Sequence, residues 1–378
     1  MFGMKICFIS YKYPGRHNTS EFAFVKQLVD AIASIGNECY VLSPYNINHY
    51  HRFSPVKETY SKGLGSVTIL RPWYLSFSSK IGFLYYLSGK FHRRAINKAF
   101  RKLPHVPDVV YGHFWNSAFY GYDYSKAHDL PLFVASGESE ISFRCNNDIK
   151  TSFCNYVRGV ICVSSKNKEE SISLGLTTPE KCQVFPNAVN ADLFKKNDKN
   201  KCREELGLPK DVFIVAFVGW FINRKGPKRV AEAINKIKGK KVYSLFIGEG
   251  EQIPNCENIL FKGSLPHNKV PLYLNAADIF VLPTFHEGCC NAVVEAMACG
   301  LPIVSSNLPF NMDVLNEHNS ILIDPNNIDE ISNAIVELRD NEEKRKCLSQ
   351  GALLTAQNLT IKNRAQAIME FINSKITK

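Results

Sequence analysis

Short apolar runs of strand length alternate with helical segments from one end of the chain to the other. Residues 5–10 (KICFIS) and 38–44 (ECYVLSP) flank segment 20–36, whose apolar residues recur at helical spacing. This spacing predicts an amphipathic helix between two strands, with Gly36 ending the helix. Further strand-like runs lie at 108–113, 130–136 and 159–165.

A second series of strand-like runs follows a polar, charged stretch that begins at residue 195. Its members are 212–219, 242–248, 259–263, 279–284, 302–306 and 320–325. Strands this apolar, separated by helices, predict parallel sheets that are covered on both faces. We therefore expect an α/β protein of two doubly wound Rossmann-like domains facing across a cleft. Residues 1–194 form the first domain and 195–361 the second, joined by a linker near 195–205, and a helix at about 362–378 is a candidate to pack back on the first.

The composition agrees with a globular protein that has an acidic partner. The 378 residues are 45% hydrophobic and 21% charged, with a net charge of +11. Such an excess suits nucleic acid, an anionic membrane or a phosphorylated substrate. No apolar run approaches the ~20 residues of a membrane-spanning helix, and the N-terminus lacks the pattern of a signal peptide. We expect a cytoplasmic protein whose scattered cysteines are reduced.

Ligands of open α/β sheets bind beyond the carboxyl ends of the strands, and the stretch 286–300 (HEGCCNAVVEAMACG) follows one of them. Its helix is expected to begin at Asn291 and to end at Gly300. Backbone N–H groups of Cys289, Cys290 and Asn291 would then face an anion such as a diphosphate.

Two glutamates border this helix start. Glu287 precedes it in the loop, and Glu295 lies one turn inside. Carboxylates accept hydrogen bonds in pairs, and sugars present hydroxyls in pairs, so the pattern indicates a diphosphate between two polyols, which is a nucleotide sugar. The alternative is a capped surface helix with two solvated acids.

Three other strand ends carry candidate residues. Arg224 and Lys225 follow the strand that ends at Gly219, where cations would stabilise a diphosphate, although a solvated basic loop is the alternative. His113 ends the run 108–113. It is expected either to donate a hydrogen bond to a sugar or to have a structural role at the strand end. Gly15, in the first loop, lets backbone approach a ligand without forming a dinucleotide-binding GxGxxG motif.

Together these stretches resemble family 4 of the retaining glycosyltransferases, which have the GT-B architecture, over most of the chain. Glu287 and Glu295 match that family's E-x7-E motif, and Lys225 matches its KG phosphate loop. The run VFPNAVNADLF is similar to its PNGVD…F segment, with Ala188 in place of glycine. His113 corresponds to the active-site histidine of the first domain.

The resemblance implies an activity and a set of roles. The second domain would bind a nucleotide sugar, with UDP-sugars favoured over GDP-sugars, and the first would supply most of the acceptor site. Glu287 would bind the transferred sugar, Glu295 the ribose, and Arg224 with Lys225 the diphosphate, while His113 touches the sugar. The reaction would be a retaining hexosyl transfer without metal or other cofactor. The expected acceptor is a growing cell-surface glycan or lipid-linked oligosaccharide, of the lipopolysaccharide or capsule type.

The chain departs from the family pattern at three places. Many members have an arginine where this chain has Trp220, so Arg224 is expected to replace that phosphate contact. Arg16 stands where a glycine is usual and is placed to reach the diphosphate or the acceptor. Cys289 and Cys290 replace Phe-Gly, which leaves the backbone donors in place.

A basic stripe lies within residues 79–103. Lys90, Arg94, Lys98 and Arg101 recur at helical spacing beside an apolar stripe. Such a helix lies on an anionic membrane surface, or else packs its apolar side on the first sheet and leaves the basic side in water. Two other functions stay open: an epimerase of sugar nucleotides with the same fold, and a basic nucleic-acid-binding protein. No nucleic-acid recognition motif is present, so we expect no nucleic acid partner.

Overall fold

The computed structural model describes residues 3–16, 22–48, 56–77, 82–143, 145–239 and 241–376. The chain divides into two compact units. The first consists of Met1–Val163, Asn167–Phe185 and Arg364–Lys378, and the second of Ser164–Lys166 and Pro186–Asn363.

The N-terminal part of the first unit runs to Phe185, whereas the sequence pattern predicts its end at residue 194. The segment that follows is bound to the second unit: Asn187 Nδ2 donates to the Cys289 carbonyl at 2.8 Å, and Val189 forms a parallel bridge with Thr360. These contacts place residues 186–194 in the second unit.

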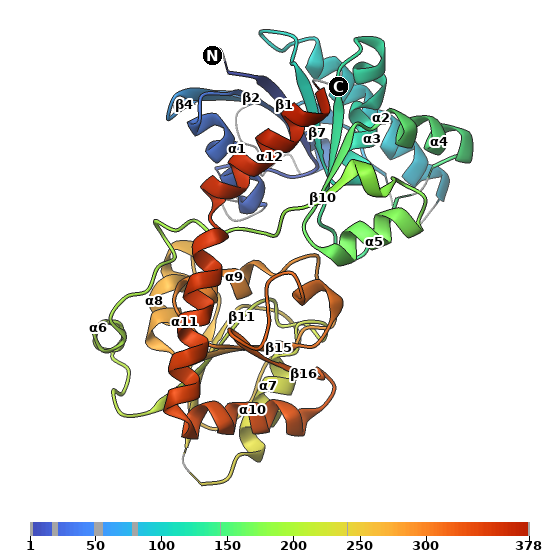
Figure 1. The fold of residues 1–378 in the computed structure, drawn as a ribbon. Coiled ribbons are helices and arrows are strands. Elements are labelled where there is room, and N and C mark those ends of the chain that lie inside the picture. Colours follow the sequence, from blue (N-terminus) through green and yellow to red (C-terminus); the bar gives the residue numbers. More distant parts are fainter. Residues whose placement is uncertain are drawn as a thin grey trace. The chain divides into compact units, whose positions relative to one another are not determined.

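The first unit contains an eight-stranded sheet in the order β10-β9-β8-β7-β1-β2-β5-β4 (Figure 1). Its strands are β1 (Lys5–Ser10), β2 (Glu38–Leu42), β4 (Lys57–Lys62), β5 (Gly65–Leu70), β7 (Val109–His113), β8 (Leu132–Ser136), β9 (Gly159–Cys162) and β10 (Cys182–Val184). All neighbours run parallel except β4, which is antiparallel to β5. A separate pair is formed by β3 (Tyr45–Asn46) and β6 (Trp73–Tyr74).

The helices of the first unit lie between its strands along the chain and at its C-terminal end. They are α1 (Ala23–Ser34), α2 (Gly82–Phe100), α3 (Trp115–Ala127), α4 (Asn147–Tyr156), α5 (Ser165–Ser173), whose first two residues fall in the second unit, and most of α12 (Ile361–Ile376). Helix α1 buries Val25, Leu28, Val29 and Ile32, and Gly36 follows it with φ 104°, as its sequence predicts. Because α1 and α3 connect strands that advance in opposite directions from β1 and β7, right-handed crossovers place them on opposite faces.

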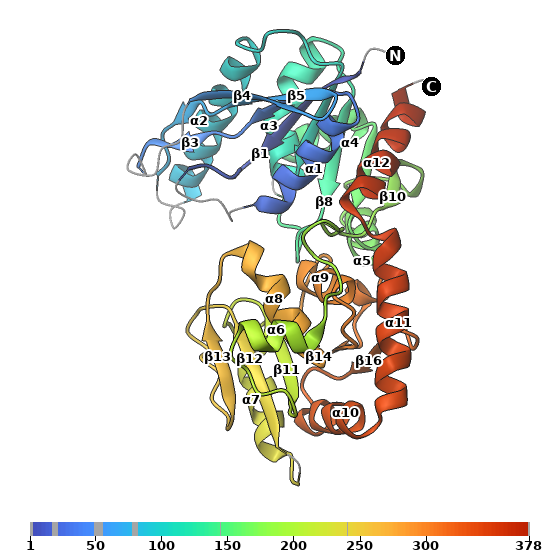
Figure 2. The ribbon, with the colours of Figure 1, turned by 90° about the vertical axis from the view of Figure 1, so that its left-hand side faces the viewer.

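The second unit contains a fully parallel sheet in the order β13-β12-β11-β14-β15-β16. Its strands are β11 (Phe213–Val218), β12 (Val242–Ile247), β13 (Ile259–Gly263), β14 (Ile279–Leu282), β15 (Ile303–Ser306) and β16 (Ser320–Ile323). Its helices are α6 (Lys199–Glu205), α7 (Pro227–Lys236), α8 (Val270–Ala276), α9 (Asn291–Ala298), α10 (Ile328–Asp340) and α11 (Glu342–Asn358). Helix α7 packs on α10, and α8 packs on α6 and α9 (Figure 2). The predicted doubly wound α/β architecture is confirmed for each unit.

The polar stretch expected to link the domains is a helix of the second unit. Asp198 caps α6 by accepting a hydrogen bond from the Lys201 N–H at 2.8 Å. Arg203, 1% exposed, pairs with Asp278 at 2.7 Å. Residues 199–205 of the expected linker thus form α6, and the charge of Arg203 is paired with Asp278 inside the second unit.

Each sheet has a point where the strand order reverses. In the second unit the chain proceeds outward from β11 to one side and from β14 to the other, and these two strands are neighbours. In the first unit the corresponding neighbours are β1 and β7. Loops that leave the carboxyl ends of such strand pairs diverge and open a crevice for ligands.

Candidate functional site

An ion cluster joins the two loops at the reversal point of the second unit. The Glu287 carboxylate, after β14, lies 2.8 Å from Arg224 Nη1 and forms an ion pair with Lys225, both of which follow β11. It also accepts a hydrogen bond from Thr284 Oγ1 at 3.1 Å. The structure thus brings together three residues that the sequence placed in two separate loops.

The cluster is largely withdrawn from water. The side chains of Glu287 and Lys225 are 12% and 11% exposed, whereas that of Arg224 is 34% exposed. Burial favours the neutral amine, but Cys290 and Glu287 outweigh it and raise the pKa of Lys225. Two cations therefore surround one carboxylate, so the cluster has one positive charge in excess for an anionic ligand.

Helix α9 starts at Asn291, as predicted, beside this cluster. Cys290 directly precedes it, and its Sγ lies 3.9 Å from Lys225 Nζ. Cys289 and Cys290 are buried, and burial raises the pKa of the Cys290 thiol. Asn187, which sequence reasoning did not single out, donates to the Cys289 carbonyl and fixes the loop before the helix.

Glu295, on α9, has a partner that the sequence did not reveal. Its Oε1 lies 2.8 Å from Nε2 of His267, whose ring centroid is 5.1 Å from that of Phe194. The hydrogen bond with Glu295 raises the pKa of His267. The expected ribose ligand therefore carries an imidazole that a ribose hydroxyl would have to share or displace.

His113 ends β7 beside Ser10 of β1, at the reversal point of the first unit. It is 5% exposed, and its ring packs on Phe24 and Phe114 at 5.3 and 4.6 Å. Burial, with the positive charge of Arg364, lowers the pKa of His113 to about 3, so the imidazole is neutral. Within the described part of the chain, its buried Nδ1 has no hydrogen-bond partner.

The loop after β1 brings Gly15 and Arg16 to the same edge as His113. Gly15 is half-buried and Arg16 is exposed. The buried Arg71 donates to the Pro14 carbonyl at 3.0 Å and anchors this loop from below.

Glu138 is a further candidate for the site, which sequence reasoning missed. It follows β8, the neighbour of β7, and its carboxylate accepts hydrogen bonds from the N–H groups of Trp115 at 3.2 Å and Gly137 at 2.9 Å. Burial raises the pKa of Glu138 to about 7, despite these bonds. Its place just after a strand is the same criterion that selected His113.

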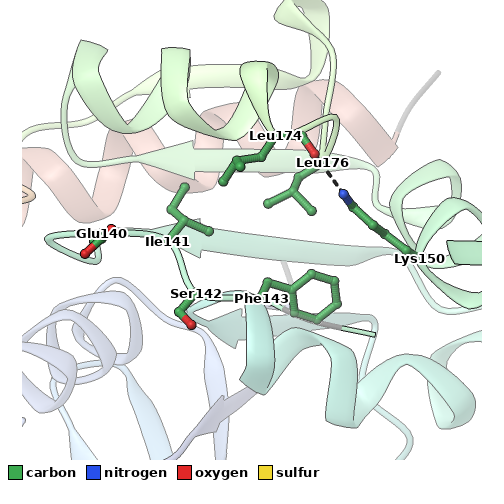
Figure 3. Close-up of a pocket in the computed structure, with 7 residues that line it drawn as sticks. All are labelled: Glu140, Ile141, Ser142, Phe143, Lys150, Leu174 and Leu176. Carbon is green, nitrogen blue, oxygen red and sulfur yellow. Dashed lines mark hydrogen bonds between the residues drawn. The ribbon is translucent and has the colours of Figure 1, made fainter. Parts of the chain in front are cut away.

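A cavity of about 480 Å³ lies in the first unit and is lined in part by the loop that follows β8 (Figure 3). The Lys150 ammonium at its wall donates to the Leu174 carbonyl at 2.8 Å. The lining is Glu140, Ile141, Ser142, Phe143, Lys150, Leu174 and Leu176, which includes none of the predicted residues.

The basic helix has two different faces. Its apolar residues Ala95, Ile96, Ala99 and Phe100 are 7%, 0%, 2% and 2% exposed, in the core of the first unit. The basic residues Lys90, Arg94, Lys98 and Arg101 are exposed. These four apolar residues are thus unavailable for insertion into a bilayer, whereas the four basic residues remain accessible to a membrane surface.

No helix described here is long and apolar enough to cross a membrane. Across the same residues, no group of three or more His, Cys, Asp and Glu side chains is positioned to hold a metal ion.

The two doubly wound units define the GT-B class of fold. Sucrose-phosphate synthase from Thermosynechococcus elongatus has a similar structure, with a TM-score of 0.79 at 17% identity, covering 99% of each chain. HepE of Anabaena in complex with UDP-glucose gives a TM-score of 0.70 at 18% identity, covering 98% of this chain and 100% of that one. At these identities the likeness shows the fold.

Sequence comparison adds the activity. Residues 198–354 match the family model described as Glycosyl transferases group 1. The chain is 25% identical to the putative teichuronic acid biosynthesis glycosyltransferase TuaC of Bacillus subtilis over 355 residues, 88% of each protein. It is 32% identical to UDP-Gal:alpha-D-GlcNAc-diphosphoundecaprenol alpha-1,3-galactosyltransferase of Escherichia coli over 201 residues, 48% of this chain and 51% of that protein. Together these similarities support a GT-B glycosyltransferase that transfers a sugar.

Proposed function

We propose that the protein is a retaining, metal-independent glycosyltransferase that moves a hexose from a nucleotide-diphosphate sugar, preferably a UDP-sugar, to a glycan acceptor. The observation that carries the proposal is the cluster of Arg224, Lys225 and Glu287 at the reversal point of the second sheet. It combines cations for a diphosphate with a carboxylate for hydroxyls, which are the two chemistries of a nucleotide sugar. UDP-glucose in the HepE structure supports the choice of base.

Each residue of the second unit has a proposed role. Arg224 and Lys225 hold the diphosphate and stabilise it as it leaves, which supplies the charge that a metal ion would otherwise supply. Glu287 binds hydroxyls of the transferred sugar, and Glu295 binds the ribose. Backbone N–H groups at the start of α9 complete the diphosphate site.

In the first unit, His113 is proposed to contact the transferred sugar. A neutral imidazole donates a hydrogen bond without repelling the positive charge that develops on the sugar ring. Arg16 is proposed to reach the acceptor or the diphosphate. In the retaining course proposed here, the diphosphate departs and the acceptor attacks on the same face, and the departing phosphate oxygen takes the acceptor proton.

The proposed acceptor is a lipid-linked oligosaccharide or growing cell-surface glycan of the lipopolysaccharide or capsule type. The names of the two curated relatives support it, since one concerns teichuronic acid and the other a diphosphoundecaprenol-linked sugar. We further propose that the exposed basic face of α2 contacts anionic lipid, through charge alone.

The test is binding and turnover with matched variants. UDP and a panel of UDP-sugars should raise the melting temperature; a ligand at 100 times its Kd adds roughly 2.7 kcal/mol to stability. Lys225→Met should lose this shift, whereas Lys236→Met, at the other end of α7, should keep it. Release of UDP that depends on acceptor indicates a transferase, and conversion of the UDP-sugar without UDP release indicates the epimerase. No shift with any nucleotide would refute the proposal.

A further inference from the structure

Trp220 is a large apolar side chain left in water beside the ion cluster. It follows Gly219 in the loop between β11 and α7, and it is 59% exposed, whereas Trp73 and Trp115 are 38% and 0% exposed. Across the described ranges, its indole has no hydrogen-bond or ring partner. Ligand sites are lined predominantly by apolar and aromatic side chains and lie beyond the carboxyl ends of strands, so this exposed indole is a candidate ligand contact.

The backbone around Trp220 is firmly held. The Gly219 N–H donates to the Ile247 carbonyl at 3.0 Å, and the Phe221 N–H donates to the Glu249 carbonyl at 2.7 Å. Phe221 is itself 3% exposed. The indole is therefore presented by a rigid backbone between two anchored neighbours.

Glycines bring the β11 and β12 loops into direct contact. A Cβ on Gly248 would lie 1.9 Å from the Gly219 carbonyl oxygen, and one on Gly250 would lie 2.4 Å from the Phe221 oxygen. The φ angles of Gly248 and Gly250, 152° and 142°, also suit glycine. This close packing leaves the loop little freedom to withdraw Trp220.

The loop also touches the ion cluster. A Cβ placed on Gly219 would lie 3.6 Å from Cδ of Lys225, whose ammonium pairs with Glu287. The residue before Trp220 is thus in contact with the aliphatic part of the lysine proposed to hold the diphosphate.

We propose that Trp220 is a carbohydrate-binding residue, whose indole stacks on the apolar C–H face of a pyranose ring. This inference rests on the proposed function. The indole carries no charge to balance a diphosphate, and its broad apolar face suits the C–H face of a pyranose, while Arg224 and Lys225 supply the charges for the diphosphate. The pyranose is either the transferred sugar of the donor or the terminal sugar of the acceptor, which have the same chemistry at their apolar faces.

The experiment compares Trp220→Ala and Trp220→Phe with Ile253→Ala, which alters another apolar residue of the same unit, 55% exposed. Calorimetry measures the affinity for UDP, UDP-glucose, UDP-galactose and UDP-N-acetylglucosamine. Turnover is measured with octyl glycosides of the same three sugars as acceptors. In Trp220→Ala we expect the affinity for UDP to stay within twofold of the wild type. If the ring belongs to the donor, affinity for the preferred UDP-sugar falls at least fivefold. If it belongs to the acceptor, the KM for the octyl glycoside rises at least fivefold instead.

The remaining outcomes decide against the inference in distinguishable ways. Trp220→Phe should retain most of the sugar-dependent affinity, because a phenyl ring also stacks, and Ile253→Ala should behave as the wild type. Unchanged values for every sugar in Trp220→Ala, or an equal loss of UDP and UDP-sugar affinity, overturn the stacking role while the proposed function stands. A wild-type protein that binds no nucleoside diphosphate overturns the proposed function, and this inference with it. Melting temperatures of all variants exclude a general loss of folding.

Discussion

Replacing Glu287 with glutamine should separate product binding from sugar transfer. In the free protein the Glu287 carboxylate already occupies the cations proposed to hold the diphosphate, at 2.8 Å from Arg224 Nη1 and in an ion pair with Lys225. A bound diphosphate must share or displace these contacts. Glutamine keeps the shape and one acceptor oxygen but removes the competing charge.

The size of the effect follows from the geometry. Each charge-assisted hydrogen bond is worth roughly 1.5–3 kcal/mol. A carboxylate about 5 Å from a phosphate charge also repels it by about 3 kcal/mol at an effective dielectric constant near 20. Recovery of even one such contribution exceeds 1.4 kcal/mol, so Glu287→Gln should bind UDP about tenfold more tightly or better. Turnover should nevertheless fall steeply, because the carboxylate no longer binds the transferred sugar in the transition state.

Stability gives a second measurement of the same effect. Without Glu287, the buried Lys225 loses its carboxylate, and breaking a buried pair in this way costs about 3–5 kcal/mol. The unliganded variant should therefore melt below the wild type, and UDP should restore more stability to the variant than to the wild type. Calorimetry, thermal melting and UDP-release kinetics measure these three quantities, with Glu249→Gln in the adjacent β12 loop as the control. Weaker or equal UDP binding in a folded Glu287→Gln protein would refute the reasoning.

Three further predictions concern protonation and charge. The folded-state pKa of Glu138, about 7, lies above its ordinary value of 4.5, so stability should fall as pH rises through this interval, by about 3 kcal/mol in total, and Glu138→Gln should remove that slope in denaturant unfolding. The pKa of His267 is raised by Glu295, so its contribution to stability should be present below about pH 6.5 and lost as pH rises through the folded pKa. The affinity for UDP should rise over the same pH range. Calorimetry of His267→Gln should show that both pH profiles are flattened. Anionic vesicles should sediment the protein at low salt and release it at high salt, since each basic residue contributes about 1 kcal/mol. Replacing Lys90, Arg94 and Lys98 with glutamate should abolish sedimentation. It should not alter the affinity for UDP.

The sequence revealed most of the buried strands, but neither β5 (Gly65–Leu70), whose last four residues are buried, nor the polar β4. Strand β14 (Ile279–Leu282), predicted within the run 279–284, is apolar at every position because parallel strands are covered on both faces. Strand β4 (KETYSK) was missed because it is a mostly exposed edge strand. The charged α6 resembled a linker because the partner of Arg203, Asp278, lies far along the chain. Local pattern does not reveal such a pairing.

The same limit applies to the candidate site. The helix start at Asn291 was predictable from local signals, and so was the position of Glu287 in the loop before it. The contacts of Glu295 with His267 and of Asn187 with Cys289 join distant segments, so no local pattern indicates them. In α2, insertion into a membrane and packing on the core require the same spacing of apolar residues in the sequence. The burial of these residues in the structure is what distinguishes the two roles.

In the unliganded protein, the cluster of Arg224, Lys225 and Glu287 indicates how one carboxylate can act both in sugar binding and in product release. A site that presented Arg224 and Lys225 alone would hold the product diphosphate tightly and release it slowly. Glu287 offers the same cations an internal anion, so departure of the product leaves Lys225 paired rather than bare in a buried position. While the donor is bound, sugar hydroxyls occupy the carboxylate and the phosphates occupy the cations, which relieves the competition. Once the sugar has left, Glu287 is again available to the cations, and this exchange favours release of the diphosphate after transfer.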